Sequence, residues 1–181
     1  MITIAAYDLR VHVSANDPDK CEEALVFSDI LIAGLTPNLV PSARSIQFLL
    51  VESNPADSYL IVEGLKRAGL TGGVRVIEDS QQALDYLRND GQPDLILLDL
   101  NLAPLTGLEL LAEIRSSPRL ESIPVIVISG SENANDIRKV YQLKANCYIN
   151  KPASLDQFLS FLKTCYDFWA TVVTLPPRDS N

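Results

Sequence analysis

From residue 45 onward, two kinds of segment alternate along the chain. Short apolar runs have the length of strands, and each is followed by a segment whose apolar residues recur every three or four positions, as on one face of a helix. The runs are Ile46–Val51, Val74–Ile77, Asp94–Asp99, Pro124–Ser129 and Cys147–Asn150. Helices are predicted from caps at Asn54, at Asp79 or Ser80 and at Ser154, and over Gly107–Ser116 and Ala134–Lys144.

This alternation predicts an α/β fold with a five-stranded parallel sheet and helices on both faces. The third and fourth runs are apolar at nearly every position, as expected for strands buried on both faces. Right-handed crossovers leave few topologies, and we expect the flavodoxin-like strand order 2-1-3-4-5. In such sheets, ligands bind at the carboxyl ends of the strands.

The carboxyl ends of four predicted strands carry polar residues. They are Glu52-Ser53, Asp99, Ser129 and Lys151. An aspartate can attack phosphorus, carboxylates can hold Mg²⁺, and a lysine and a hydroxyl can bind phosphoryl oxygens. Together, these groups on one edge of a sheet indicate phosphoryl transfer.

Four motifs resemble those of the receiver domain of two-component response regulators. They are Val51–Pro55, Leu97–Leu102 followed by Gly107, Ile128–Gly130, and Lys151-Pro152. Their order and separations also match the family, because Ser129 lies 30 residues and Lys151 lies 52 residues after Asp99. Four motifs in register are far more specific than any one of them alone.

This resemblance implies a role for each residue at the strand ends. Asp99 is expected to accept a phosphoryl group from a histidine kinase, and Lys151 to contact the phosphate. Ser129 and Tyr148 are expected to form the switch, although the alternation of the last strand also fits Tyr148 as a packing residue. Similar domains have a cis bond at the position of Lys151-Pro152, whereas an X-Pro sequence alone favours trans.

The resemblance also implies a metal site. Glu52, Asp99 and the backbone carbonyl of Asn101 are expected to bind Mg²⁺. The family has a second acidic residue where this chain has Ser53, and a neutral hydroxyl attracts a cation far less than a carboxylate does. We therefore expect weakened Mg²⁺ affinity and slower phosphorylation. The proline at Ala103-Pro104 comes one place later than usual, but the spacing of Gly107 is kept.

The resemblance covers residues 45–175, which we expect to form the receiver domain. Residues 1–44 do not fit the repeat and are interpreted as an N-terminal extension of unknown role, and residues 176–181 as a C-terminal tail. The segments 52–57 and 167–177 resemble single-domain regulators related to those paired with phytochrome histidine kinases. This resemblance implies a phytochrome-type kinase as the partner.

Three functional hypotheses follow. The first is a single-domain response regulator that signals by protein–protein interaction and is no enzyme beyond slow self-dephosphorylation. The second is a pseudo-receiver, an interaction module that works without phosphorylation because the acid at position 53 is missing. The third is a phosphatase of the dehalogenase type, which ranks last because position 101 is Asn and that mechanism needs an aspartate there.

The last predicted helix carries an apolar arc about 180° wide on a helical wheel, more than a core-facing stripe needs. The residues of the arc are Leu155, Phe158, Leu159, Phe161, Leu162, Cys165, Tyr166, Phe168, Trp169 and Val172. Two interpretations remain open: residues 1–44 cover the surplus, or it forms a homodimer or partner surface.

Composition narrows the class of protein. A formal net charge of −8 and a pI near 4.6 argue against nucleic acid or an anionic membrane as the partner. No apolar run approaches the roughly 20 residues that cross a bilayer. Cys21, Cys147 and Cys165 are an odd number without metal-site spacing, which indicates reduced thiols and a cytoplasmic protein. His12 is the single histidine, so a multi-histidine metal site is excluded.

Overall fold

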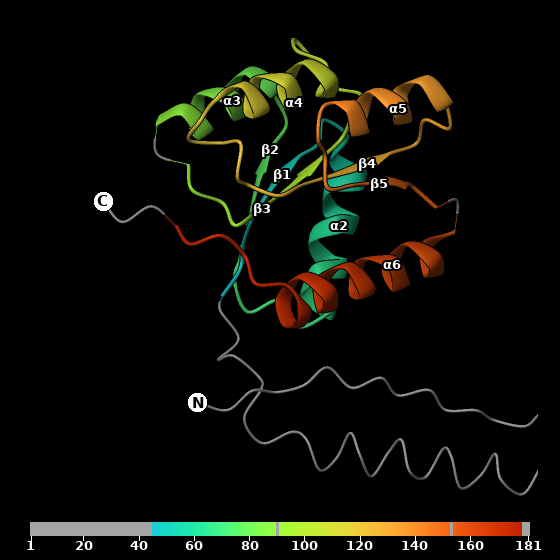
Figure 1. Cartoon of the computed structure of the whole chain (residues 1–181). Helices are drawn as coiled ribbons and strands as arrows, with labels where there is room; N and C mark the ends of the chain where they lie inside the picture. The colour runs from blue at the N-terminus through green and yellow to red at the C-terminus, as the bar shows by residue number, and fades with distance from the viewer. Residues whose placement is uncertain (1–44, 90, 153, 179–181) are drawn as a thin grey trace, which may run out of the picture. The chain divides into compact units, whose positions relative to one another are not determined.

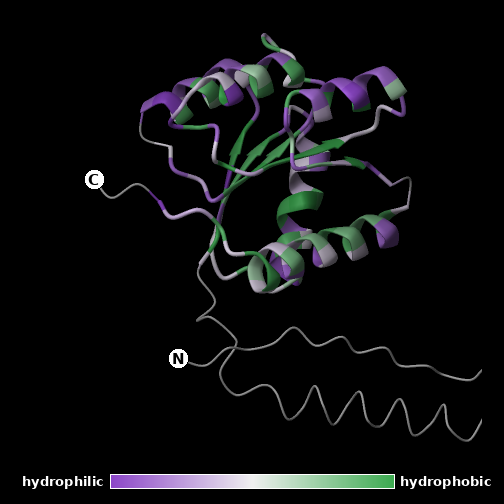
Figure 2. Cartoon of the chain, in the orientation of Figure 1, coloured by the Kyte–Doolittle hydropathy of each residue, from purple (hydrophilic) through white to green (hydrophobic). Residues whose placement is uncertain are grey.

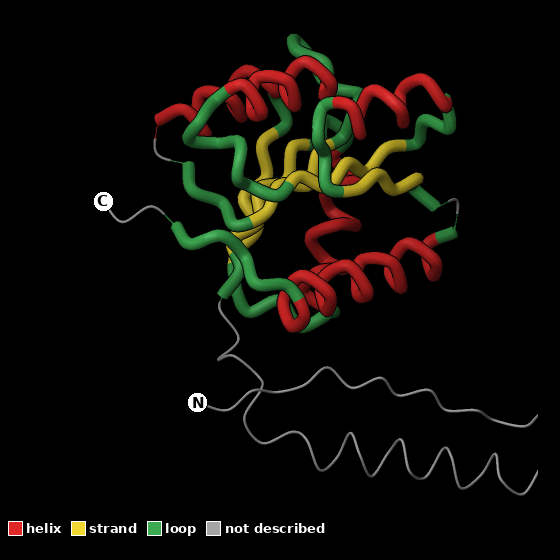
Figure 3. Tube along the Cα trace, in the orientation of Figure 1, coloured by secondary structure: helices red, strands yellow, loops and turns green. Residues whose placement is uncertain are grey.

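The computed structural model describes residues 45–178 apart from residues 90 and 153. A parallel sheet with the strand order β2-β1-β3-β4-β5 forms the centre of this part (Figures 1 and 3). The strands are β1 (Gln47–Val51), β2 (Gly73–Ile77), β3 (Leu95–Leu98), β4 (Val125–Ser129) and β5 (Cys147–Asn150). The predicted fold class and strand order are confirmed. The expectations for residues 1–44 lie outside the described residues.

Helices cover both faces of the sheet (Figure 1). They are α2 (Pro55–Arg67), α3 (Ser80–Asn89), α4 (Gly107–Ser116), α5 (Ala134–Gln142) and α6 (Leu155–Asp167), which continues as a π-helical turn, η1 (Phe168–Val172). One core joins the sheet to α3, α4 and α5, and the other joins it to α2 and α6.

Each central strand supplies side chains to both cores. In β1, Leu49 and Val51 belong to the core under α3, α4 and α5, whereas Phe48 and Leu50 belong to the core under α2 and α6. The residues of β3 and β4 divide between the two cores in the same alternating way. Successive side chains of a strand point to opposite faces, so a strand covered on both sides must be apolar throughout. Figure 2 shows the result: the strands are largely hydrophobic, whereas the helices mix hydrophobic and hydrophilic residues.

Local interactions begin and end the helices near the predicted positions. The side chains of Asn54 and Ser154 accept backbone N–H groups in the first turns of α2 and α6. For α3, the cap is Asp79 rather than Ser80, because the Asp79 carboxylate accepts the Gln82 N–H at 2.8 Å. The end of α5 was predicted two residues too late. Lys144 has φ 60°, a left-handed conformation that cannot continue a helix.

The C-terminal helix is only partly covered by the sheet. Phe158, Leu162 and Tyr166 are buried in the core, whereas Leu155 and Phe168 are among the exposed apolar residues. The surplus apolar surface predicted for this helix is therefore present on the described part of the chain. No helix within that part is both long and apolar enough to cross a membrane.

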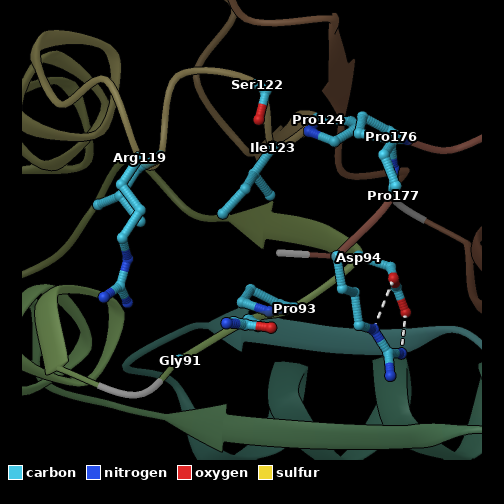
Figure 4. Close-up of a pocket in the computed structure, with 12 residues that line it drawn as sticks. Gly91, Pro93, Asp94, Arg119, Ser122, Ile123, Pro124, Pro176 and Pro177 are labelled. Atoms are coloured by element: carbon cyan, nitrogen blue, oxygen red, sulfur yellow. Dashed lines mark hydrogen bonds and ion pairs between the residues drawn. The ribbon is translucent and has the colours of Figure 1, made fainter. Parts of the chain in front are cut away.

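After η1, the chain returns to the amino edge of the sheet. Pro176 and Pro177 line a small pocket of about 50 Å³ together with Asp94, which directly precedes β3 (Figure 4). Arg178 forms a two-pronged ion pair with the buried carboxylate of Asp94, and its Nε donates to Oδ1 at 3.0 Å. Residues 176–178, the described part of the expected tail, thus contact the amino edge of the sheet.

Candidate functional site

The residues that follow the strands meet at the carboxyl edge of the sheet. Glu52 after β1, Asp99 after β3, Ser129 at the end of β4 and Lys151 after β5 all line one pocket of about 530 Å³. The sheet is parallel and β1, β3 and β4 are neighbours, so side chains from distant parts of the sequence come together there. This is the convergence that the strand pattern predicts.

Lys151 lies at the centre of this group. Its Nζ is 2.7 Å from Oε2 of Glu52, 2.8 Å from Oδ2 of Asp57 and 3.1 Å from Oδ1 of Asp99. Burial disfavours the charged ammonium, but the hydrogen bonds to Asp57 and Glu52 and the charge of Asp99 outweigh that effect and raise the pKa of Lys151. The side chain is therefore a fixed positive charge among three carboxylates.

Glu52 and Asp99 are nearly inaccessible, with 2% and 4% of their surface exposed. The Glu52 carboxylate accepts the backbone N–H of Asn54 at 2.8 Å. Burial raises the pKa of Glu52, and the hydrogen bonds from Lys151 and Asn54 oppose this shift. The Asp99 carboxylate accepts the backbone N–H of Asn101. Both acids are thus oriented by the backbone as well as by the lysine.

The loop after Asp99 folds tightly against it, which explains the glycine of the motif. Gly107 donates its N–H to the carbonyl of Leu100 at 3.0 Å. A Cβ added at Gly107 would lie 2.1 Å from the carbonyl oxygen of Asp99, far inside contact distance. Gly107 is therefore needed for close approach to the backbone of the phosphoacceptor candidate.

Ser53 faces the same edge, but not as a replacement for a carboxylate. Its hydroxyl donates to the backbone carbonyl of Asn101 at 3.0 Å. That carbonyl is the one that the resemblance assigns to the metal. The side chain at position 53 thus lacks a negative charge and also occupies a lone pair of another expected ligand.

Ser129 and Tyr148 are linked through a third residue. The Ser131 N–H donates to Oγ of Ser129 at 3.2 Å, and the Tyr148 hydroxyl donates to the carbonyl of Ser131 at 2.6 Å. The two expected switch residues are therefore coupled through one peptide segment at the start of the β4–α5 loop.

Sequence reasoning missed Asp57 and Ser131. Asp57 could have been found from its position, because it lies in the first turn of α2, close to the strand end that carries Glu52. Nothing in the sequence distinguishes Ser131. The expectation of a cis bond before Pro152 is wrong: among the described residues the cis X-Pro bond is Ala103–Pro104. At Lys151–Pro152, the trans form that X-Pro sequences ordinarily favour is kept.

Comparison with known proteins assigns the family. A family model for the response regulator receiver domain matches residues 48–163. The chain belongs to the response-regulator receiver family. Response regulator Rcp1 of Synechocystis is 39% identical over 134 residues, which cover 71% of this chain and 91% of Rcp1.

Two solved receivers have similar folds. The phosphorylated cyanobacterial phytochrome response regulator RcpA is 44% identical, with a TM-score of 0.70 over 73% of this chain and 99% of that one. The Mn²⁺-bound form of Rcp1 is 38% identical, with a TM-score of 0.69 and the same coverage of both chains. The present receiver thus shares with them its fold and most of its folded length. Proteins of this family are generally phosphoacceptors rather than enzymes that turn over a substrate.

Proposed function

We propose that this chain is a single-domain response regulator whose Asp99 accepts a phosphoryl group from a histidine kinase. The observation that carries the proposal is the meeting of Asp99 and Lys151, 3.1 Å apart, in one open pocket at the carboxyl edge of the sheet. In the transfer, an Asp99 oxygen forms a bond to phosphorus while the bond from phosphorus to the kinase imidazole breaks. Lys151 stabilises the negative charge of the phosphoryl oxygens, and the Ser129 hydroxyl binds one of them afterwards.

The donors at the pocket fit Mg²⁺. Glu52 and Asp99 provide carboxylates and Asn101 a backbone carbonyl, and Mg²⁺ is commonly held by one or two carboxylates with waters and phosphate oxygens. Rcp1, a relative, is known in a Mn²⁺-bound form. When bound, the ion offsets the charge that develops on the transferring group.

The site of this protein is expected to bind Mg²⁺ weakly. Within residues 45–178, leaving out 90 and 153, no three acidic, histidine or cysteine side chains are arranged to share one metal ion. The hydroxyl of Ser53 is hydrogen-bonded to the carbonyl of Asn101, so it competes with the ion for that oxygen. Ser53→Asp should therefore lower the Mg²⁺ concentration that gives half-maximal phosphorylation. If the wild type and the variant needed the same Mg²⁺ concentration, the reasoning would be contradicted.

Phosphorylation would be read out through the β4–α5 loop. A phosphoryl group that draws the Ser129 hydroxyl toward it changes the contact with the Ser131 N–H, and Ser131 in turn holds the Tyr148 hydroxyl. A local charge is thereby converted into a rearrangement of the face formed by α5, β5 and α6.

The relatives and an exposed helix suggest the partners. RcpA is a phytochrome response regulator, which supports a phytochrome-type histidine kinase as the donor of the phosphoryl group. Three cysteines without metal-site spacing support the cytoplasm as the place of this transfer. The exposed residues Leu155, Phe168 and Val172 on α6 and η1 support a homodimer through the last helix. A protein that stays monomeric at high concentration, with and without beryllofluoride, would contradict the dimer.

Incubation with acetyl phosphate and Mg²⁺, followed by intact-mass measurement, tests the proposal. We expect an adduct of one phosphoryl group that is lost in Asp99→Asn and kept in Asp136→Asn, which changes a second carboxylate of the same pocket. The second candidate function, a phosphorylation-independent pseudo-receiver, is favoured by the missing acid at position 53. It predicts no adduct in the wild type and partner binding that Asp99→Asn does not change.

A further inference from the structure

Asp57 is a third carboxylate at the site. The proposed function gives a role to Glu52 and Asp99 but none to Asp57. It belongs to the first turn of α2, and its Oδ2 lies 2.8 Å from Nζ of Lys151. Glu52 and Asp99, the two acids expected to hold the metal, contact the same ammonium at 2.7 and 3.1 Å. One lysine is therefore shared among three carboxylates, of which Asp57 is the most exposed.

The sharing matters because Lys151 and a metal ion attract the same oxygens. An ammonium paired with Glu52 and Asp99 neutralises the charge that a cation needs, and opposite charges at about 3 Å interact strongly in a partly buried site. Asp57 is a third partner of the same ammonium, so Lys151 offsets less of the charge of Glu52 and Asp99 than it would if it were paired with those two alone. Ser53 provides no charge to compensate, because its hydroxyl is neutral, and that hydroxyl also donates to the Asn101 carbonyl.

We propose that Asp57 is a positioning residue that shares Lys151 with Glu52 and Asp99 and so restores part of the cation affinity lost through Ser53. The inference depends on the proposed function, because it assumes that Glu52 and Asp99 bind the metal. Asp57 touches the lysine and not the reacting atoms. Its effect should therefore appear in metal affinity and should depend on which residue occupies position 53.

A purely structural role for Asp57 predicts something different. An acid in the first turn of a helix interacts favourably with the helix dipole. Loss of that interaction would lower the melting temperature of the protein. It would not change cation affinity in a way that depends on residue 53, which lies before the helix.

A Mn²⁺ titration of the full-length protein, with free Mn²⁺ measured by electron paramagnetic resonance, separates these roles. Asp57→Asn should weaken Mn²⁺ binding by about tenfold, because the ammonium is then shared by two carboxylates only and offsets more of the charge that the cation needs. Asp136→Asn is the matched control. Its carboxylate lines the same pocket but accepts a hydrogen bond from Ser131, so we expect at most a twofold change.

The decisive comparison uses the Ser53→Asp background. There, a carboxylate at position 53 supplies the missing charge, and Asp57→Asn should weaken Mn²⁺ binding by less than about threefold. Equal losses in the two backgrounds, or equal losses for Asp57→Asn and Asp136→Asn, would overturn the inference while leaving the proposed function intact. A wild-type protein that bound no Mn²⁺ would overturn both.

Discussion

Replacement of Arg178 by alanine removes an ion-pair partner of a buried carboxylate at the amino edge of the sheet. Asp94 directly precedes β3, and only 1% of its side chain is exposed. Nε and Nη2 of Arg178 donate to its two oxygens, and the Gln47 N–H donates to Oδ2 at 2.8 Å. The perturbation therefore tests whether the segment after η1 contributes to the stability of the folded domain.

The expected magnitude follows from the burial of the two partners. Removal of one member of a fully buried ion pair costs about 3–5 kcal/mol, because a buried charge is left uncompensated. The Arg178 side chain is 40% exposed, so water reaches this pair and can hydrate Asp94 in the variant. We discount the cost for this solvation and expect Arg178→Ala to lower the free energy of unfolding by about 2 kcal/mol.

Urea denaturation followed by circular dichroism measures this difference as a shift of the midpoint at an unchanged slope. Arg88→Ala is the matched control. Arg88 contacts Glu113 at 2.8 Å, but both side chains are exposed, at 54% and 45%, so its loss should cost less than about 1 kcal/mol. Equal midpoints for the two variants would show that the burial of Asp94 gives the pair no added strength, and would refute the reasoning.

Three further predictions concern the site and the core. Gly107→Ala should cost about 1–3 kcal/mol in urea unfolding, because its Cβ would overlap a backbone carbonyl, whereas Gly130→Ala meets no atom within 4 Å and should cost far less. Tyr148→Phe removes the hydroxyl bonded to Ser131 and should cost about 1 kcal/mol; an unchanged midpoint would contradict a role for that bond. Burial raises the pKa of Cys165 to about 12, so iodoacetamide at pH 8 should modify this thiol far more slowly in the folded than in the urea-unfolded protein. An unfolded thiol ionises near pH 8.5, so the stability due to this neutral group should fall as the pH rises above about 9.

Much of the fold is determined by local sequence, through helix caps and the pattern of apolar and polar residues. The helix Gly107–Ser116 has the predicted bounds, and its start is fixed by the reciprocal cap that Thr106 and Glu109 form around its first turn. The strands are predicted almost as well, since apolar runs buried on both faces stand out from the amphipathic helices between them. The order of the strands follows from the handedness of the crossovers rather than from any single residue.

The candidate site is determined by the sequence only in part. The position of Asp99 and Lys151 at strand ends is sufficient to bring them to one edge of a parallel sheet. The sequence does not show that Lys151 also binds Asp57, or that Ser53 donates to Asn101. These contacts join groups 94 and 48 residues apart in the sequence, and their geometry depends on how α2 and the loop after β3 pack.

The amino edge of the sheet shows most clearly which features the sequence determines and which depend on the tertiary structure. The sequence pattern carries the apolar arc of the last helix to Val172, and residues 176–181 are interpreted as a tail. Only the tertiary structure places Arg178 against Asp94, 84 residues earlier in the chain. A strand or helix is specified by its own residues through backbone hydrogen bonds and side-chain periodicity. A contact between distant side chains exists only after the sheet has formed and the chain has returned across its edge, so no local pattern encodes it.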